Sequence, residues 1–120
     1  MKSNLGNPVI RFDIGCRDSA ATQKFYTSVF GWKTNAAQHA TNVNTQNTKG
    51  IDGSITSLGH EPHNYVMIYI EVDSVTEAIK KIEAHGGQKH IGPLPTGTGQ
   101  YFAWVHDPEG TQLGIVSDKE

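Results

Sequence analysis

The pattern of apolar and polar positions predicts a strand followed by a helix in the first half of the chain. Residues 9–14 alternate with period two, as in a strand with one apolar and one polar face. A helix is predicted from Asp18, a good capping residue, to Gly31, a typical helix end. Apolar residues recur at every fourth position of the predicted helix, at Ala21, Phe25 and Val29, and are joined by Tyr26 and Phe30. This face should cover the apolar side of the strand.

The same pattern returns in the second half of the chain. Residues 65–72 alternate more regularly, and their apolar face consists of Val66, Ile68, Ile70 and Val72. Ser74 and Glu77 have the spacing of a capping box, and Gly86 provides the helix end. The start signals at Asp18 and Asp73 and the two glycine stops have one common offset, so the chain is predicted to contain one module twice.

Further strands are predicted after each helix. In the second copy they lie near residues 88–91, 100–106 and 111–117, and the last two are joined by a tight turn at residues 106–110. In the first copy, residues 41–48 are almost all Asn, Thr and Gln. They fit a solvated hairpin, which we favour, or a mobile flap. Each module is therefore expected to be a strand, a helix and up to three strands.

Length and charge exclude several classes of protein. A chain of 120 residues is expected to form one domain, residues 1–120, with its own core. Ten basic and twelve acidic residues give a net charge of −2 without a Lys/Arg cluster, so nucleic acid is not an expected partner. The sequence has no run of membrane-spanning length, and its start lacks a signal-peptide pattern, so a cytoplasmic protein is expected. Its one cysteine, Cys16, excludes an internal disulfide.

Several sequence motifs are spread along the chain: FYTSVFGW at residues 25–32, GIDGS at 50–54, YIEVD at 69–73, and the DPEG turn followed by TQLGIV at 107–116. Together they resemble the vicinal oxygen chelate superfamily, which includes glyoxalase I, extradiol dioxygenases and bleomycin-resistance proteins. The resemblance implies an α+β fold with two paired βαβββ modules, about residues 8–58 and 65–117. Their sheets would curl around a central cleft that holds the ligand, with the helices outside.

The resemblance also implies where a metal ion would be held in members that use one. The matching positions are Arg11, Gly53 or Ser54, Met67 and Gly114. These side chains are poor ligands for a divalent cation, and the positive charge of Arg11 would repel one. We therefore expect no metal site and no cofactor in this chain, which argues against glyoxalase I or dioxygenase chemistry of the usual kind.

The polar strand faces supply the candidate site residues. Strand parity, together with the cleft that the resemblance implies, predicts a ligand-binding set of Arg11, Asp13, Met67, Tyr69, Glu71, Phe102 and Trp104. Arg11 and Asp13 could hold an anionic or hydrogen-bonding ligand, or could pair with each other or with Glu71. Gly53 and Gly114 could permit close strand packing or leave room for a ligand. If a reaction occurs, the acid or base candidates are Asp13, Glu71 and His106.

The remaining histidines give no site pattern. Residues 60–63, His-Glu-Pro-His, lack a helical face for metal ligands and are expected to be a solvated linker. His39, His85 and His90 are expected to be exposed and to have no particular partner.

Two functions fit these observations. The first is a glyoxalase or bleomycin-resistance-like protein that binds a small organic molecule without the usual metal. The second is a glyoxalase-like lyase, isomerase or dioxygenase that uses a divalent metal held by non-standard ligands. A homodimer is expected by resemblance, because small two-module members of this superfamily frequently pair.

Overall fold

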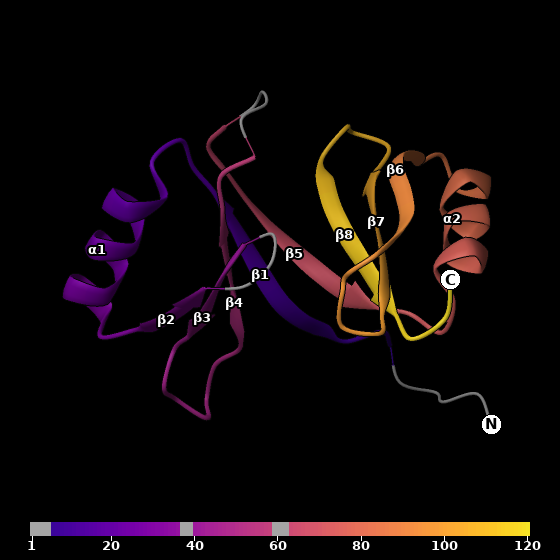
Figure 1. Cartoon of the computed structure of the whole chain (residues 1–120). Coiled ribbons are helices and arrows are strands. Elements are labelled where there is room, and N and C mark those ends of the chain that lie inside the picture. Colours follow the sequence, from indigo (N-terminus) through magenta and orange to yellow (C-terminus); the bar gives the residue numbers. More distant parts are fainter. Residues whose placement is uncertain (1–5, 37–39, 59–62) are drawn as a thin grey trace. The chain divides into compact units, whose positions relative to one another are not determined.

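The computed structural model describes residues 6–36, 40–58 and 63–120. Each half of the chain forms a strand, a helix and three further strands (Figure 1). The first half contains β1 (Val9–Gly15), α1 (Ser19–Phe30), β2 (Lys33–Ala36), β3 (Thr41–Asn44) and β4 (Asp52–Thr56). The second contains β5 (Tyr65–Glu71), α2 (Val75–Ala84), β6 (Gln88–Pro95), β7 (Tyr101–His106) and β8 (Gln112–Ser117). The predicted α+β class and the twofold βαβββ order are confirmed.

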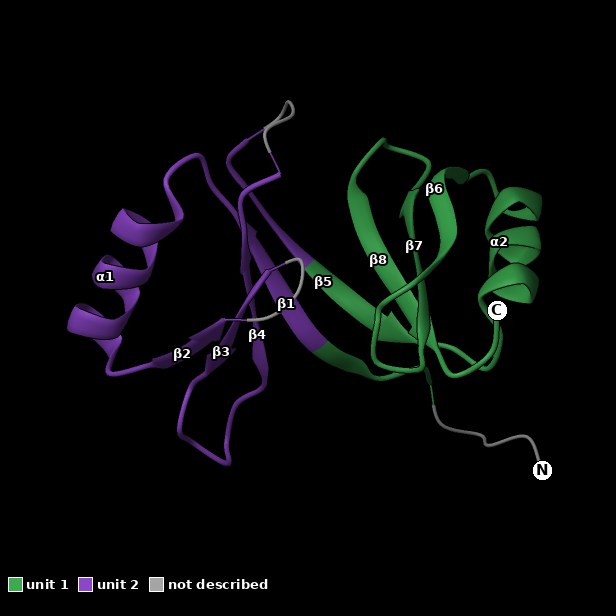
Figure 2. Cartoon of the chain, viewed as in Figure 1, with its two compact units in different colours: residues 1–10, 68–120 green, residues 11–67 purple. Residues whose placement is uncertain are grey.

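The chain divides into two compact units (Figure 2). We call Arg11–Met67 the N-terminal unit, and Met1–Ile10 together with Ile68–Glu120 the C-terminal unit. In the N-terminal unit the strand order is β2-β3-β4-β1, and in the C-terminal unit it is β5-β8-β7-β6. In each unit one pair is parallel, β1 with β4 and β5 with β8, and the other pairs are antiparallel. Neither described helix has the length and apolar character needed to cross a membrane.

The core of the C-terminal unit lies between α2 and one face of the sheet. Val75 and Ile79 of the helix pack against Ala103, Val105 and Ile115, which are at most 2% exposed. The helix begins as the capping pattern predicts, because the hydroxyl oxygen of its N-cap residue Ser74 accepts a hydrogen bond of 3.2 Å from the backbone of Glu77. Ala103 and Val105 of β7 thus face the helix.

The core of the N-terminal unit is built differently. Its buried residues are Ile14, Cys16, Val43 and Ile55, and the rings of Phe12, Tyr26 and Trp32 pack against them. The side chain of Asp18 caps α1 by accepting a 3.0 Å bond from Ala21, and Gly31 ends the helix in the left-handed conformation with φ 72°. The predicted bounds of this helix are thus confirmed.

The predicted burial of the α1 stripe is wrong. Ala21 is exposed, and Phe25 and Val29 are 54% and 57% exposed. The helix is held instead by Tyr26, whose ring stacks on Trp32 with centroids 5.1 Å apart. Tyr26, rather than the four-residue stripe, is thus the α1 side chain that packs against the core of this unit.

The predicted burial of β5 is wrong at its start. Val66 is 73% exposed and Ile68 is 40% exposed, whereas Met67 between them is 3% exposed. Helix α1 packs against β2 and β4, and α2 packs against β6, β7 and β8. The predicted alternation is therefore right in placing Val66 and Ile68 on one face. They remain exposed because, within the unit to which each belongs, the helix packs against other strands.

The polar segment after α1 is a hairpin rather than a flap. Strands β2 and β3 pair antiparallel from Lys33 opposite Asn44 to Ala36 opposite Thr41, and β3 pairs antiparallel with β4. Residues 37–39, including His39, lie outside the described residues, as do residues 59–62 of the predicted linker. The favoured prediction for this polar stretch is confirmed in its described part.

Candidate functional site

In the C-terminal unit, the sheet face opposite α2 carries aromatic and polar side chains. Trp104 pairs with Gly114 across β7 and β8, and Tyr69 pairs with Gly114 across β5 and β8, so the three residues share one face. The indole Nε1–H of Trp104 donates a hydrogen bond of 2.9 Å to the hydroxyl oxygen of Tyr69. The predicted orientation of Trp104, away from the helix, is therefore confirmed, and its partner Tyr69 lies on the same surface.

Gly114 is covered by the Tyr69 ring. A Cβ atom added at Gly114 would overlap the ring atoms of Tyr69. This close approach explains why β8 has glycine here, and it supports the packing interpretation over the interpretation that Gly114 leaves room for a ligand. Gly53 of the other unit is similar, because a Cβ there would overlap the backbone oxygen and ring of Phe12.

Two histidines meet on the same face of the C-terminal unit. His90 Nδ1 lies 3.2 Å from His106 Nε2, and the His90 ring stands edge-on to Trp104 with centroids 6.3 Å apart. His90 is exposed, as expected, but the expectation that it lacks a partner is wrong. Lys89 pairs with Val105, whose side chain packs under α2, so strand alternation places His90 on the opposite face with Trp104 and His106. The register of β6 against β7 shifts just beyond this point, between Lys89 and Ile91.

The other candidates of this unit occupy the same strands. Phe102 of β7 lies opposite Val116 of β8 and is half-buried. Glu71 is exposed at the end of β5. His106 is half-buried and follows the same alternation as Trp104. Of the acid or base candidates, Glu71 and His106 thus belong to the C-terminal unit, while Asp13 belongs to the N-terminal unit.

In the N-terminal unit, Asp13 is the centre of a buried hydroxyl network. Its side chain is 3% exposed. Its Oδ1 accepts hydrogen bonds from Ser54 at 2.8 Å and Thr56 at 2.7 Å, and its Oδ2 accepts one from Tyr65 at 3.1 Å. The parallel register places Asp13 beside Ser54, so β1, β4 and β5 all contribute to this network. The sequence points to Asp13 but not to its three donors, which come from more distant segments.

Arg11 differs from Asp13 in having no polar partner within its own unit. It is half-buried on β1, on the same face as Asp13, and pairs in register with Asp52. Among the described residues of this unit, Arg11 makes no hydrogen bond or ion pair. The described partners of Asp13 are hydroxyls, and Arg11 is not among them.

The positions that hold a metal in the superfamily do not suit one here. Ser54 donates its hydroxyl to Asp13, Met67 is 3% exposed, and Gly114 lies beneath a tyrosine ring. Arg11 adds a positive charge. Over the part of the chain that the structure describes, no three His, Cys, Asp or Glu side chains form a group that could hold a metal ion.

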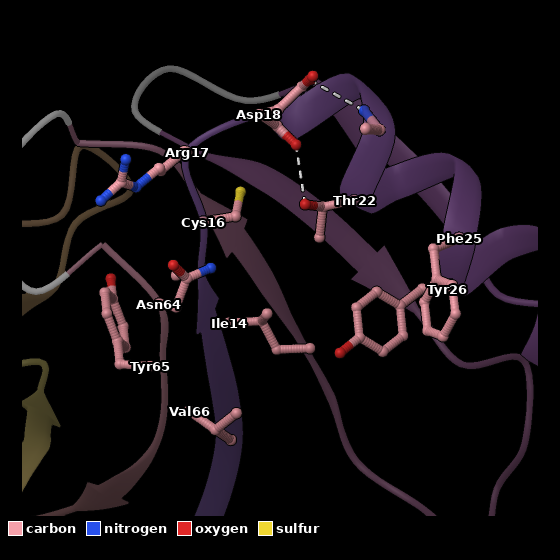
Figure 3. Close-up of a pocket in the computed structure, with 12 residues that line it drawn as sticks. Ile14, Cys16, Arg17, Asp18, Thr22, Phe25, Tyr26, Asn64, Tyr65 and Val66 are labelled. Carbon is pink, nitrogen blue, oxygen red and sulfur yellow. Dashed lines mark hydrogen bonds between the residues drawn. The ribbon is translucent and has the colours of Figure 1, made fainter.

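A cavity lies elsewhere, on the helix side of the N-terminal unit (Figure 3). It measures about 690 Å³, and its apolar wall is formed by Ile14, Cys16, Phe25, Tyr26 and Val66. The Asp18 carboxylate at its rim caps α1, and the Asp18 carbonyl accepts a 2.8 Å bond from Thr22. Because both of these Asp18 groups are used in hydrogen bonds with the first turn of α1, we place the candidate site on the polar sheet faces that carry Asp13 and Trp104.

Comparison with known proteins agrees with this architecture. The model of the Glyoxalase/Bleomycin resistance protein/Dioxygenase superfamily matches residues 9–115. The chain belongs to this superfamily. It is 25% identical over 127 residues to a glyoxylase-like domain-containing protein of Didymella fabae, covering 94% of this chain and 95% of that protein. It is 26% identical over 111 residues to the glyoxylase-named protein CFP32 of Mycobacterium tuberculosis, covering 86% of this chain but only 42% of that longer protein.

Solved structures show the same fold. Methylmalonyl-CoA epimerase from Mycobacterium tuberculosis superposes with a TM-score of 0.74 at 9% identity, covering 100% of this chain and 94% of that chain. The hypothetical protein BH1468 from Bacillus halodurans superposes with a TM-score of 0.71 at 18% identity, covering 97% of both chains. At such identities the likeness concerns the fold and does not extend to the reaction.

Proposed function

We propose that this superfamily member binds a small organic molecule that carries an anionic group, and that it does so without a metal at the superfamily positions. The ligand-binding residues in this proposal are Arg11, Asp13, Met67, Tyr69, Glu71, Phe102 and Trp104. Asp13 and Met67 act from beneath the surface, since both are 3% exposed. Asp13 orients the Tyr65 hydroxyl through their hydrogen bond.

The observation that carries the proposal is the guanidinium of Arg11, which makes no hydrogen bond or ion pair with the described residues of its unit. A half-buried cation has lost part of its hydration, and within its unit Arg11 gains no described hydrogen bond in return. An anionic ligand group would supply charge-assisted hydrogen bonds, which are among the strongest in proteins. On the C-terminal unit, the half-buried Tyr69 ring fits an aromatic or conjugated ligand body, and Trp104, which is 6% exposed, supports that ring from below through its hydrogen bond.

A ligand panel read by tryptophan fluorescence tests the proposal. The sequence has two tryptophans, so a Trp32→Phe variant leaves Trp104 as the reporter. Aromatic carboxylates should quench Trp104, and Arg11→Ala should weaken their binding by about 1.5–3 kcal/mol, the scale of a hydrogen bond to a charged group. Arg17→Ala is the matched control, because Arg17 is the other arginine of the sequence and lies beyond the end of β1.

Two results would contradict the proposal. One is equal binding by the Arg11→Ala and Arg17→Ala variants, which would show that Arg11 does not hold the anionic group. The other is loss of folding on Arg11→Ala, which would make Arg11 a structural residue.

The alternative is a glyoxalase-like enzyme of this superfamily. The contact between His106 and His90 favours it, because each ring can accept a proton from the other or pass one to a ligand. Turnover that is lost on His106→Gln and retained on His85→Gln would favour the enzyme over a protein that only binds.

A further inference from the structure

We propose that His90 and His106 form a binding site for a divalent transition-metal ion. The two residues lie on β6 and β7 of the C-terminal unit. They are distinct from the superfamily positions Arg11, Ser54, Met67 and Gly114. The proposal is independent of the small-molecule function proposed above, since it needs only these two imidazoles.

The distance between the two nitrogens fits a shared metal ion. His90 Nδ1 and His106 Nε2 are 3.2 Å apart. A metal ion bound by two imidazoles at about 2.0–2.1 Å in a tetrahedral arrangement places their nitrogens about 3.3 Å apart. The observed pair therefore needs almost no change in separation to receive an ion between its nitrogens.

The distance between the rings gives a second criterion. Two imidazoles aligned end to end at this nitrogen separation would have centroids about 5.5 Å apart, whereas imidazoles converging on one ion have centroids about 5.1 Å apart. The observed centroid distance is 5.0 Å, with the rings inclined at 64°. The rings are thus not aligned end to end, and their separation matches that of two imidazoles on one ion.

The surroundings leave this point open to solvent ions. His90 is exposed and His106 is half-buried. The nearest cation in sequence, Lys89, pairs with Val105, whose side chain belongs to the core under α2, so Lys89 lies on the opposite face. Asp107 uses its Oδ1 to accept backbone bonds from Glu109 and Thr111, which hold the turn after β7.

The number of ligands predicts the type of binding. The described residues contain no group of three metal-binding side chains. The ion would therefore have two imidazole ligands, and water molecules would complete its coordination. Such a site is expected to exchange its ion readily. Imidazole ligands favour Cu²⁺, Ni²⁺ and Zn²⁺ over Mg²⁺ and Ca²⁺, and Cu²⁺ should bind most tightly of these.

Trp104 provides a direct readout, because the His90 ring lies against it. In a Trp32→Phe background, Cu²⁺ and Ni²⁺ should each quench the fluorescence of Trp104, and Mg²⁺ should not. His90→Ala and His106→Ala should each lower the affinity for Cu²⁺, measured by this quenching, at least about tenfold. Loss of a metal ligand should cost no less affinity than loss of a group that orients a ligand. His85→Ala is the matched control, an exposed histidine of the same unit whose Nδ1 lies 2.8 Å from the Lys81 carbonyl oxygen.

Calorimetric titration with Zn²⁺ checks that the quenching reports binding, with one ion per chain expected. Unchanged Cu²⁺ affinity in either histidine variant would overturn the proposal, as would equal weakening by His85→Ala. Circular dichroism shows whether each variant is folded, and His90→Asn replaces any alanine variant that is not. Ligand binding measured in the presence of a chelator tests the proposed small-molecule function separately, so either proposal can fail alone.

Discussion

Replacement of Asp13 should reveal how its buried carboxylate is stabilised. Asp13→Ala removes the acceptor for three hydroxyls, those of Ser54, Thr56 and Tyr65. Ser54 and Thr56 are themselves 6% and 7% exposed, so water cannot easily replace the lost acceptor. Arg11 lies on the same strand face, yet it makes no described ion pair with Asp13. The network therefore predicts very different effects at Asp13 and Arg11.

The expected magnitudes follow from the hydrogen bonds. Each bond to a charged group contributes about 1.5–3 kcal/mol, and the contributions within one network are not additive. Asp13→Ala should therefore lower the free energy of unfolding by about 3–5 kcal/mol, in the range of the most damaging substitutions. Asp13→Asn keeps an acceptor for Ser54 and Thr56 and offers an N–H to the Tyr65 oxygen, so about 1–2 kcal/mol is expected. Arg11→Ala should cost less than about 1 kcal/mol.

Urea unfolding followed by circular dichroism measures these differences. All variants should be compared at one protein concentration, because any self-association would add to the apparent stability. An equal loss on Arg11→Ala and Asp13→Ala would refute the reasoning, since it would indicate that the two form a buried ion pair. A loss below about 1 kcal/mol on Asp13→Ala would also refute it, because the hydroxyls would then have found other partners.

Two further predictions concern the Tyr69 ring and self-association. Gly114→Ala should lower stability by about 1–3 kcal/mol, since the new Cβ would overlap the Tyr69 ring, and the loss should shrink in a Tyr69→Ala background. Equal losses in both backgrounds, measured by urea unfolding, would contradict the overlap. Light scattering should give the mass of a homodimer, and Val66→Asp should shift the protein toward monomer because an exposed apolar strand residue gains from burial. A monomer mass for the unsubstituted chain at micromolar concentration would count against the dimer.

The sequence determined the elements and the face on which most side chains lie. Capping at Asp18 and Ser74 and the stop at Gly31 involve groups a few residues apart, so their chemistry can be read locally. Period-two alternation placed Trp104 opposite the helix and Ala103 and Val105 beneath it, because successive residues of a strand point to opposite faces. The common offset of the start and stop signals predicted the repeated module, which the order of the elements confirms. The family motifs indicated the superfamily, which the family match confirms.

Only the tertiary structure decided which of these residues are buried and what they contact. Phe25 and Val66 have the apolar pattern of core residues but remain exposed, because burial depends on whether another element packs over them. The hydroxyl partners of Asp13 come from β4 and β5, and His90 meets His106 because β6 pairs with β7. Periodicity is a property of neighbouring residues, whereas strand register and packing are set by contacts between distant segments, so the contacts of the candidate site could not be derived from the pattern alone.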